Sequence, residues 1–281
     1  MKIFELLKKG TEILSKNLPE INSRFESELL LAFVLKKERI YLAINLSENI
    51  SDDASNLFLS YIARRANCEP ISYITGTKEF MSLNFCVMPG VLIPRPDTET
   101  LCLHVIDEFK GEGFNMLDLC TGSGAICVSL AKYIKNTFVD ALDISDVCVN
   151  ATKINAENNG VSEFINVIQA DVLKGFKTSK KYDCIVSNPP YIKSEAIPHL
   201  MKDVRDFEPV SALDGGDNGL IFYEKISSTA PSMLKDNGML AFEVGHDQSE
   251  KVKNIMIRNG FKKIKLIKDL AGIDRVVSGR I

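Results

Sequence analysis

The sequence has no tryptophan, only three histidines, and no two cysteines spaced as C-x-x-C. The histidines, His104, His199 and His246, lie far apart and share no metal-ligand spacing with the cysteines. Structural zinc sites need clustered histidine and cysteine ligands. We therefore expect that no metal ion is required.

Long apolar runs and a strong net charge are missing as well. No apolar stretch approaches the roughly 18 residues typical of a membrane-spanning helix, so we expect no membrane association. The 281 residues carry a formal net charge of −3. This balance argues against a protein that holds long nucleic acid by neutralising its phosphates.

The seven cysteines occur mostly in apolar surroundings, as Cys127 does in AICVSL and Cys184 in YDCIVS. An odd number of cysteines in such places is typical of free thiols in a reducing compartment. The first residues, MKIFELLKKGTEIL, have the apolar spacing of a helix and lack the continuous apolar core of a signal peptide. We expect a cytoplasmic protein.

What the sequence does contain divides into three parts. Residues 1–70 hold three apolar stripes at helical spacing, which predicts a small helical domain. Residues 71–96 alternate in polarity between glycines and are predicted to form a β-hairpin linker. In residues 97–281 seven strand-like segments take turns with helical ones, except that no helix separates the last two. This order is typical of an α/β, doubly wound, Rossmann-like domain that ends in an antiparallel hairpin.

A glycine-rich turn, LDLCTGSGAI, joins the first strand of this domain to its first helix. Gly122 and Gly124 remove side chains where a ligand would approach the backbone, and the helix start offers free N–H groups. Asp143 ends the next predicted strand, where its carboxylate can accept both hydroxyls of a ribose. The loop thus predicts a nucleoside site, although an ordinary turn with a surface aspartate would look similar.

Two nucleoside cofactors fit such a loop. A dinucleotide site requires G-x-G-x-x-G, and Cys127 stands where the third glycine belongs. A D-x-G-x-G-x-G loop, which holds the methionine part of S-adenosyl-L-methionine, matches Asp118, Gly122 and Gly124. Cys120 replaces its first glycine; cysteine is small and fits there if its backbone angles are ordinary. We favour S-adenosyl-L-methionine.

The end of the third strand, QADVL, brings two more residues to the same edge of the sheet. Asp171 can accept from an adenine amino group and Val172 can lie beside the ring, although Asp171 could equally cap a helix. The residues expected to bind the cofactor are Cys120, Thr121, Gly122, Ser123, Gly124, Asp143, Asp171, Val172 and Asn188.

The fourth strand runs into SNPPYI. Methyl transfer is an in-line displacement, so an enzyme must align a nucleophile with the methyl carbon. Asn188 offers a side-chain carbonyl and Pro189 a backbone carbonyl, which together can take both N–H protons of a planar amine. Pro190 restricts Pro189 to an extended shape, and Tyr191 can stack on a flat substrate. The alternative is a rigid turn with no chemical role.

Five motifs together resemble the PrmC (HemK) family of protein-(glutamine-N5) methyltransferases: GTKEF, LIPRPDTE, LDLCTGSGAI, SNPPYI and ALDGGDNGL. The resemblance implies a class I methyltransferase fold, a substrate-binding role for residues 1–70, and S-adenosyl-L-homocysteine as the product. It further implies that class I peptide-chain release factors are the substrates. The glutamine of their Gly-Gly-Gln motif would lie between Asn188, Pro189 and Tyr191. The departures are Cys120 and Asn218, where the family tends to carry glycine and aspartate.

Other functions stay open from the residues alone. An adenine-N6 nucleic-acid methyltransferase grips an exocyclic amine equally well, but it must extrude its base and track phosphates. A nucleoside-binding scaffold is the alternative without catalysis. Arg95, Glu99 and Glu243 could line the site or serve only as local structural charges.

Overall fold

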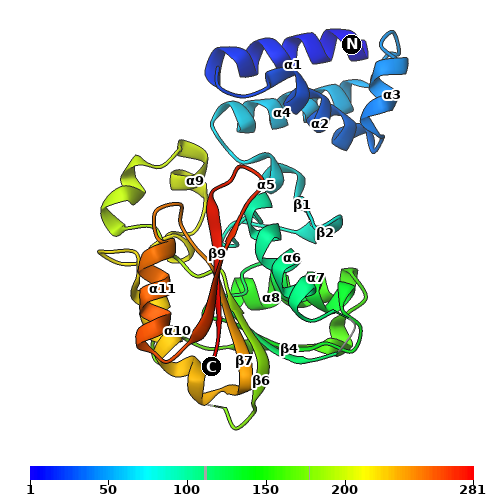
Figure 1. Ribbon diagram of the computed structural model, residues 1–281. Coiled ribbons are helices and arrows are strands. Elements are labelled where there is room, and N and C mark those ends of the chain that lie inside the picture. The colour runs from blue at the N-terminus through cyan, green and yellow to red at the C-terminus, as the bar shows by residue number, and fades with distance from the viewer. Residues whose placement is uncertain (111–112, 177) are drawn as a thin grey trace. The chain divides into compact units, whose positions relative to one another are not determined.

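The computed structural model describes residues 1–110, 113–176 and 178–281. Contacts divide these residues into two compact units (Figure 1). The first unit comprises Met1–Gly76 with Met201–Phe207, and the second comprises Thr77–Leu200 with Glu208–Ile281. Among the described residues no helix combines the length and the apolar character that a bilayer crossing requires.

The first unit is helical. Its helices are α1 (Ile3–Asn17), α2 (Ser23–Leu35), α3 (Arg39–Ile44), α4 (Asp52–Ala66), α5 (Ile71–Thr75) and α9 (Lys202–Phe207). Side-chain caps start α2 and α4, because Asn22 accepts from the N–H of Phe25 and Ser51 from that of Ala54. The three predicted apolar stripes correspond to α1, α2 and α4. The sequence did not predict α3 and α5, because they are too short to give a readable apolar period.

The predicted hairpin is shorter than 71–96. Strands β1 (Thr77–Phe80) and β2 (Leu83–Cys86) pair antiparallel around Met81 and Ser82, both with positive φ, as a two-residue hairpin turn requires. Residues 71–75 are helical instead. Val91 and Ile93 are buried but lie outside any strand, so burial in a loop produced part of the alternation.

The second unit is built on one sheet. Its strands are β3 (Asn115–Leu119), β4 (Phe138–Asp143), β5 (Ile165–Gln169), β6 (Tyr182–Ser187), β7 (Leu234–Glu243), β8 (Lys262–Lys268) and β9 (Asp274–Arg280). Within the described residues these seven lie in the order β5-β4-β3-β6-β7-β9-β8. The first five are parallel, and β9 runs antiparallel to both β7 and β8, which confirms the Rossmann-like prediction and its final hairpin.

Helices cover both faces of this sheet (Figure 1). They are α6 (Glu99–Glu108), α7 (Ala125–Tyr133), α8 (Asp146–Asn158), α10 (Ile221–Thr229) and α11 (Ser249–Arg258). Short 3-10 turns are η1 (Pro96–Thr98), η2 (Ser162–Phe164), η3 (Ser194–His199), η4 (Val210–Ala212) and η5 (Ala230–Ser232).

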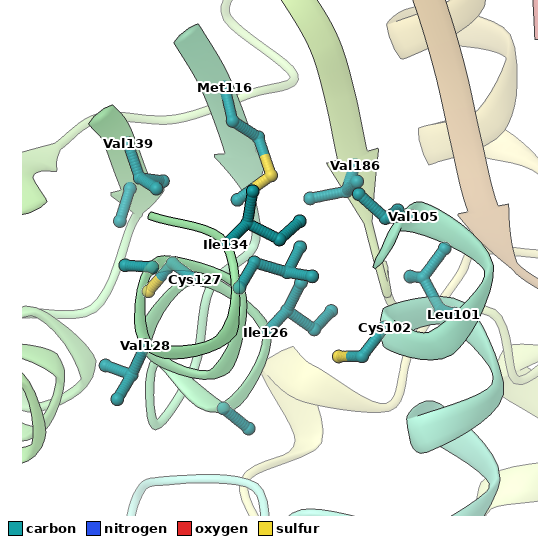
Figure 2. Packing of buried hydrophobic residues seen from close by; sticks show 14 of the residues in the cluster. Leu101, Cys102, Val105, Met116, Ile126, Cys127, Val128, Ile134, Val139 and Val186 are labelled. Carbon is teal, nitrogen blue, oxygen red and sulfur yellow. The ribbon is translucent and has the colours of Figure 1, made fainter. Parts of the chain in front are cut away.

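Alternate residues of each central strand fill two separate cores. Met116 and Val186 pack with α6 and α7 on one face, as Figure 2 shows around Ile126. Leu117 and Ile185 pack with α10 and α11 on the other. Because both faces are buried, these strands are apolar throughout. The loops that follow the parallel strands meet at the carboxyl ends of these strands. The strand order reverses between β3 and β6, which is the place where α/β sheets of this kind bind ligands.

Candidate active site

A cavity of about 430 Å³ opens at the carboxyl ends of β3, β4 and β6. All its lining residues belong to the second unit. The volume suits a ligand of nucleoside size. Of the residues expected at the site, nine line it: Cys120, Thr121, Gly122, Ser123, Asp143, Asp171, Val172, Asn188 and Pro190. Gly124, Pro189 and Tyr191 are not among the described lining residues.

The two glycines of the loop after β3 differ in what they permit. Both have positive φ, +58° at Gly122 and +79° at Gly124. A Cβ on Gly122 would meet nothing within 4 Å, so this position keeps the loop backbone open toward the cavity. A Cβ on Gly124 would lie 2.9 Å from Cγ2 of Thr152, so this position lets the loop pack on α8. The Thr152 hydroxyl also donates to the carbonyl of Gly122 at 3.1 Å.

Cys120 lines the cavity in a conformation that the sequence did not predict. Its φ is +62°, in the left-handed region, so cysteine occupies this position without the ordinary backbone angles on which we made its fit depend. This conformation costs a residue with a Cβ about 1–2 kcal/mol. The loop therefore keeps a glycine-type backbone at the position where the related family tends to carry glycine.

Asp118 is fully buried beneath the loop and does not line the cavity. The hydroxyl of Thr121 donates to its Oδ2 at 2.7 Å. Burial raises the pKa of Asp118 to about 7, against the opposing effect of this hydrogen bond. The residue anchors the loop from below and is not placed to touch a ligand in the cavity.

Asp143 and Asp171 both line the cavity. The carboxylate of Asp143 accepts from the N–H of Gly122 at 2.9 Å and from that of Ser145 at 3.0 Å. Burial raises its pKa, and these backbone hydrogen bonds oppose that shift. Asp171 accepts from the N–H of Leu173 at 2.9 Å, so it stabilises a local turn while lining the cavity.

Asn188 directly follows β6, the strand beside β3, and lines the same cavity as the loop after β3. Its side-chain N–H₂ donates to the hydroxyl of Thr98 at 3.2 Å. The hydroxyl of Thr98 can donate as well as accept, but the neighbouring carboxylate of Glu243 only accepts, so the N–H₂ group is assigned to the side of these two residues; no described residue donates to Oδ1. Behind it the carbonyl of Tyr191 accepts from the side chain of Gln248 at 3.0 Å, which holds the Asn-Pro-Pro-Tyr segment from β7's side of the sheet.

Several residues resolve alternatives that the sequence left open. Arg95 lines the cavity and pairs with Glu208 at 2.5 Å. Glu99 instead accepts from the N–H of Met81 at 2.7 Å, so it fixes the hairpin turn. Glu243 is buried and is not among the described lining residues.

Sequence reasoning missed many contributors to the site. Among them are Thr98 and Ile144, which line the cavity, and Gln248, which holds the Asn-Pro-Pro-Tyr segment behind it. Thr98 stands inside LIPRPDTE, so its motif was noticed although its contact with Asn188 was not. Ile144 and Gln248 follow strand ends as ordinary residues. No local pattern distinguishes them.

The fold and the cavity together define a methyltransferase of the Rossmann-like type. A solved methyltransferase from Pyrococcus furiosus shares this fold with a TM-score of 0.54 at 19% identity, over 72% of this chain and 91% of that one. Residues 5–76 match the PrmC N-terminal domain model, and residues 94–204 match the methyltransferase small domain model.

Full-length relatives identify the family. The release factor glutamine methyltransferase of Clostridium acetobutylicum is 42% identical over 99% of this chain and 98% of its own length. That of Clostridium botulinum is 41% identical over 100% of this chain and 99% of its own length. The chain belongs to the release factor glutamine methyltransferase family, which confirms the resemblance seen in the motifs.

Proposed function

We propose that this enzyme transfers a methyl group from S-adenosyl-L-methionine to the side-chain amide nitrogen (N5) of glutamine. The acceptor is the glutamine of the Gly-Gly-Gln motif in class I peptide-chain release factors, and the methylation modulates translation termination. The observation that carries the proposal is Asn188, whose free Oδ1 stands at the edge of a cavity of nucleoside size.

The residues of the cavity fit the proposed donor. Asp143 would accept from the ribose hydroxyls, and the open side of Gly122 would leave room for the methionine part. Val172 and Ile144 offer apolar surface for an adenine ring, with Asp171 beside them to accept from its amino group. When bound, the donor supplies a methyl group on a positively charged sulfur.

The Asn-Pro-Pro-Tyr segment would hold the acceptor amide. Asn188 Oδ1 and the carbonyl of Pro189 would accept the two N–H protons of the glutamine amide, which orients its nitrogen toward the methyl carbon. Tyr191 would pack on the planar amide. The carbon–nitrogen bond forms as the carbon–sulfur bond breaks, and one amide proton then leaves. No base stronger than these oxygens is required before transfer.

The cellular setting follows from the same proposal. All seven cysteines are unpaired, which suits a reducing compartment. We place the enzyme in the cytoplasm, where class I release factors meet it as protein partners. The net charge of −3 gives it no evident means of holding long nucleic acid.

The test is methylation of a purified release factor with isotope-labelled donor, followed by mass spectrometry of the Gly-Gly-Gln peptide. We expect label on the glutamine and none on a release factor whose glutamine is replaced by alanine. Asn188→Ala should lower kcat by about 100-fold or more through loss of one acceptor, with the melting temperature nearly unchanged. Label confined to DNA adenine, or an Asn188→Ala enzyme with normal turnover, would contradict the proposal.

A further inference from the structure

Glu243 occupies an unusual position for a carboxylate. It ends β7, and the parallel register pairs Phe242 with Ser187 of β6, so Glu243 and Asn188 are the next residues on neighbouring strands. Its exposed fraction is only 2%. Burying a carboxylate costs several kcal/mol unless it serves a partner. A purely structural position of this kind would be better filled by an apolar residue.

The contacts of Glu243 point to Asn188. Side-chain hydrogen bonds from Thr98 and from Asn188 favour its charged form. Its Oε2 has no hydrogen-bond partner among the described residues, and none of their ion pairs includes it. Arg275, the nearby cation, is already paired with Asp97 at 2.9 Å and Asp269 at 3.0 Å.

Thr98 connects the two residues. Its side chain is buried, and its hydroxyl accepts from Asn188 Nδ2 at 3.2 Å. A hydroxyl has a single proton to donate, and the buried carboxylate of Glu243, whose charged form Thr98 favours, is the acceptor that stands beside it. Thr98 and Glu243 therefore present only acceptors to the Asn188 N–H₂ group, which turns Oδ1 toward the cavity.

We propose that Glu243 and Thr98 are positioning residues that hold the Asn188 amide with its oxygen facing the substrate nitrogen. This inference rests on the proposed function, because it concerns how the acceptor amide is gripped. Without them Asn188 could rotate by half a turn and offer N–H₂ to a substrate that itself offers N–H₂. Two donors would then face each other and the acceptor would be lost.

The geometry makes the positioning sensitive to pH. Burial raises the pKa of Glu243 to about 7, with Asp97 adding to the shift and Thr98, Arg275 and Asn188 opposing it. A protonated Glu243 would donate to Thr98 and compete there with Asn188. Turnover should therefore fall as pH drops through about 7. Tyr191, Tyr223 and Cys102, which lie near Glu243, have raised pKa values and stay neutral in this range. Asp118, beneath the loop after β3, also has a pKa raised to about 7, so the part of the acid limb that belongs to Glu243 is the part that Glu243→Gln removes.

The test compares Thr98→Val, Thr98→Ser and Glu243→Gln with the unmodified enzyme, using a purified release factor and labelled donor from pH 6 to 9. We expect Thr98→Val to lower kcat by about 10- to 100-fold, the loss of one buried hydrogen bond, with the KM for the donor little changed. Thr98→Ser should restore most of the rate. Glu243→Gln should be slower and should lose the acid limb near pH 7.

Asp140→Asn is the matched control. Asp140 is a second buried carboxylate of the same sheet, held by Lys180 at 2.8 Å and Tyr182 at 2.7 Å, and it does not line the cavity. Its replacement should lower the melting temperature but leave the pH profile of kcat unchanged. A normal rate in Thr98→Val, or an acid limb that persists in Glu243→Gln, would overturn the positioning role. An unmodified enzyme that never labels glutamine would instead overturn the proposed function.

Discussion

At the scale of single residues, Cys120 shows how a loop can keep its backbone shape after its sequence has changed. The left-handed φ of +62° places it in a region where a Cβ crowds the next carbonyl oxygen. It borders the cavity, so its small side chain also limits how much space the residue takes there. The strain is tolerated because Asp118 and Thr121 fix the loop from below.

The effect of replacing Cys120 on the free energy of unfolding should therefore depend on whether the new residue has a Cβ and whether that Cβ is branched. Cys120→Gly should raise the free energy of unfolding by about 0.5–1 kcal/mol, because relief of the strain exceeds the added flexibility of the unfolded chain. Cys120→Val should lower it by about 1–3 kcal/mol, because a β-branched side chain fits the left-handed region poorly. Urea unfolding curves measure both. A valine variant as stable as the unmodified enzyme would show that the position is not strained.

At the scale of elements, the sequence predicted a helix best where the helical spacing of apolar residues continues over two turns or more. The sequence pattern predicts helices over residues 125–133, 146–158 and 249–258, which agree with α7, α8 and α11. The strand-like segments NMLDLC, TFVDALDI, INVIQA and YDCIVS likewise contain β3, β4, β5 and β6. Short helices such as α3, and buried loop residues such as Ile93, were misassigned because burial there is decided by tertiary packing.

The candidate site was predictable to the same degree. The residues after β3, β4, β5 and β6 could be grouped because parallel strands end at one edge of a sheet. The sequence could not predict the contacts of Thr98 and Gln248 or the burial of Glu243. Each of these depends on which side chain from a distant segment of the chain packs behind the cavity.

The packing of the loop after β3 against α8 gives an element-scale prediction. Gly124→Ala should lower the free energy of unfolding by about 2–4 kcal/mol, because it adds a clash with Thr152 to a positive φ. Gly122→Ala has the same kind of φ but an open surrounding, so it should cost only about 1 kcal/mol and mainly weaken donor binding.

Thermal unfolding and a donor-binding titration separate these two effects. The double variant Gly124→Ala with Thr152→Ser removes the methyl group that is struck and should recover part of the lost stability. Equal losses of stability in the two single alanine variants would refute the assigned role of Gly124 in packing.

At the scale of the whole molecule, each compact unit has its own buried core, and the cavity lies entirely within the second. In that unit one carboxylate joins both strands of the final hairpin to α6, beside a hydrogen bond between His104 of α6 and Ser278 of β9 at 2.9 Å. Glu108, at the end of α6, pairs with Lys265 of β8 at 2.5 Å and Arg280 of β9 at 2.6 Å. Two strands and a helix that are distant in sequence are thereby connected through a half-buried charge.

The free energy of unfolding should depend on pH because of the ion pairs that Glu108 makes with Lys265 and Arg280. The hydrogen bonds from Lys265 and Arg280 lower the pKa of Glu108 from 4.5 to about 2. A carboxylate with a lowered pKa stabilises the folded state above its unfolded pKa, and that contribution is lost as pH falls from about 4.5 toward 2. Glu108→Gln should therefore lower the free energy of unfolding by about 1 kcal/mol at pH 7, a value reduced for solvent screening. The deficit should shrink between pH 4.5 and the onset of acid unfolding.

The neighbouring Asp107 provides the matched control for this prediction. It pairs with Lys110, which lies just beyond the end of α6, but its side chain is 66% exposed. Asp107→Asn should leave the unfolding curve unchanged at every pH, because an exposed pair gains little over hydration. Urea unfolding at pH 7, 5, 4 and 3 distinguishes the two variants, because most of the Glu108 contribution is lost below pH 4. A Glu108→Gln deficit that stays constant down to pH 4 and below would mean that packing of the side chain, and not its charge, stabilises the hairpin against α6.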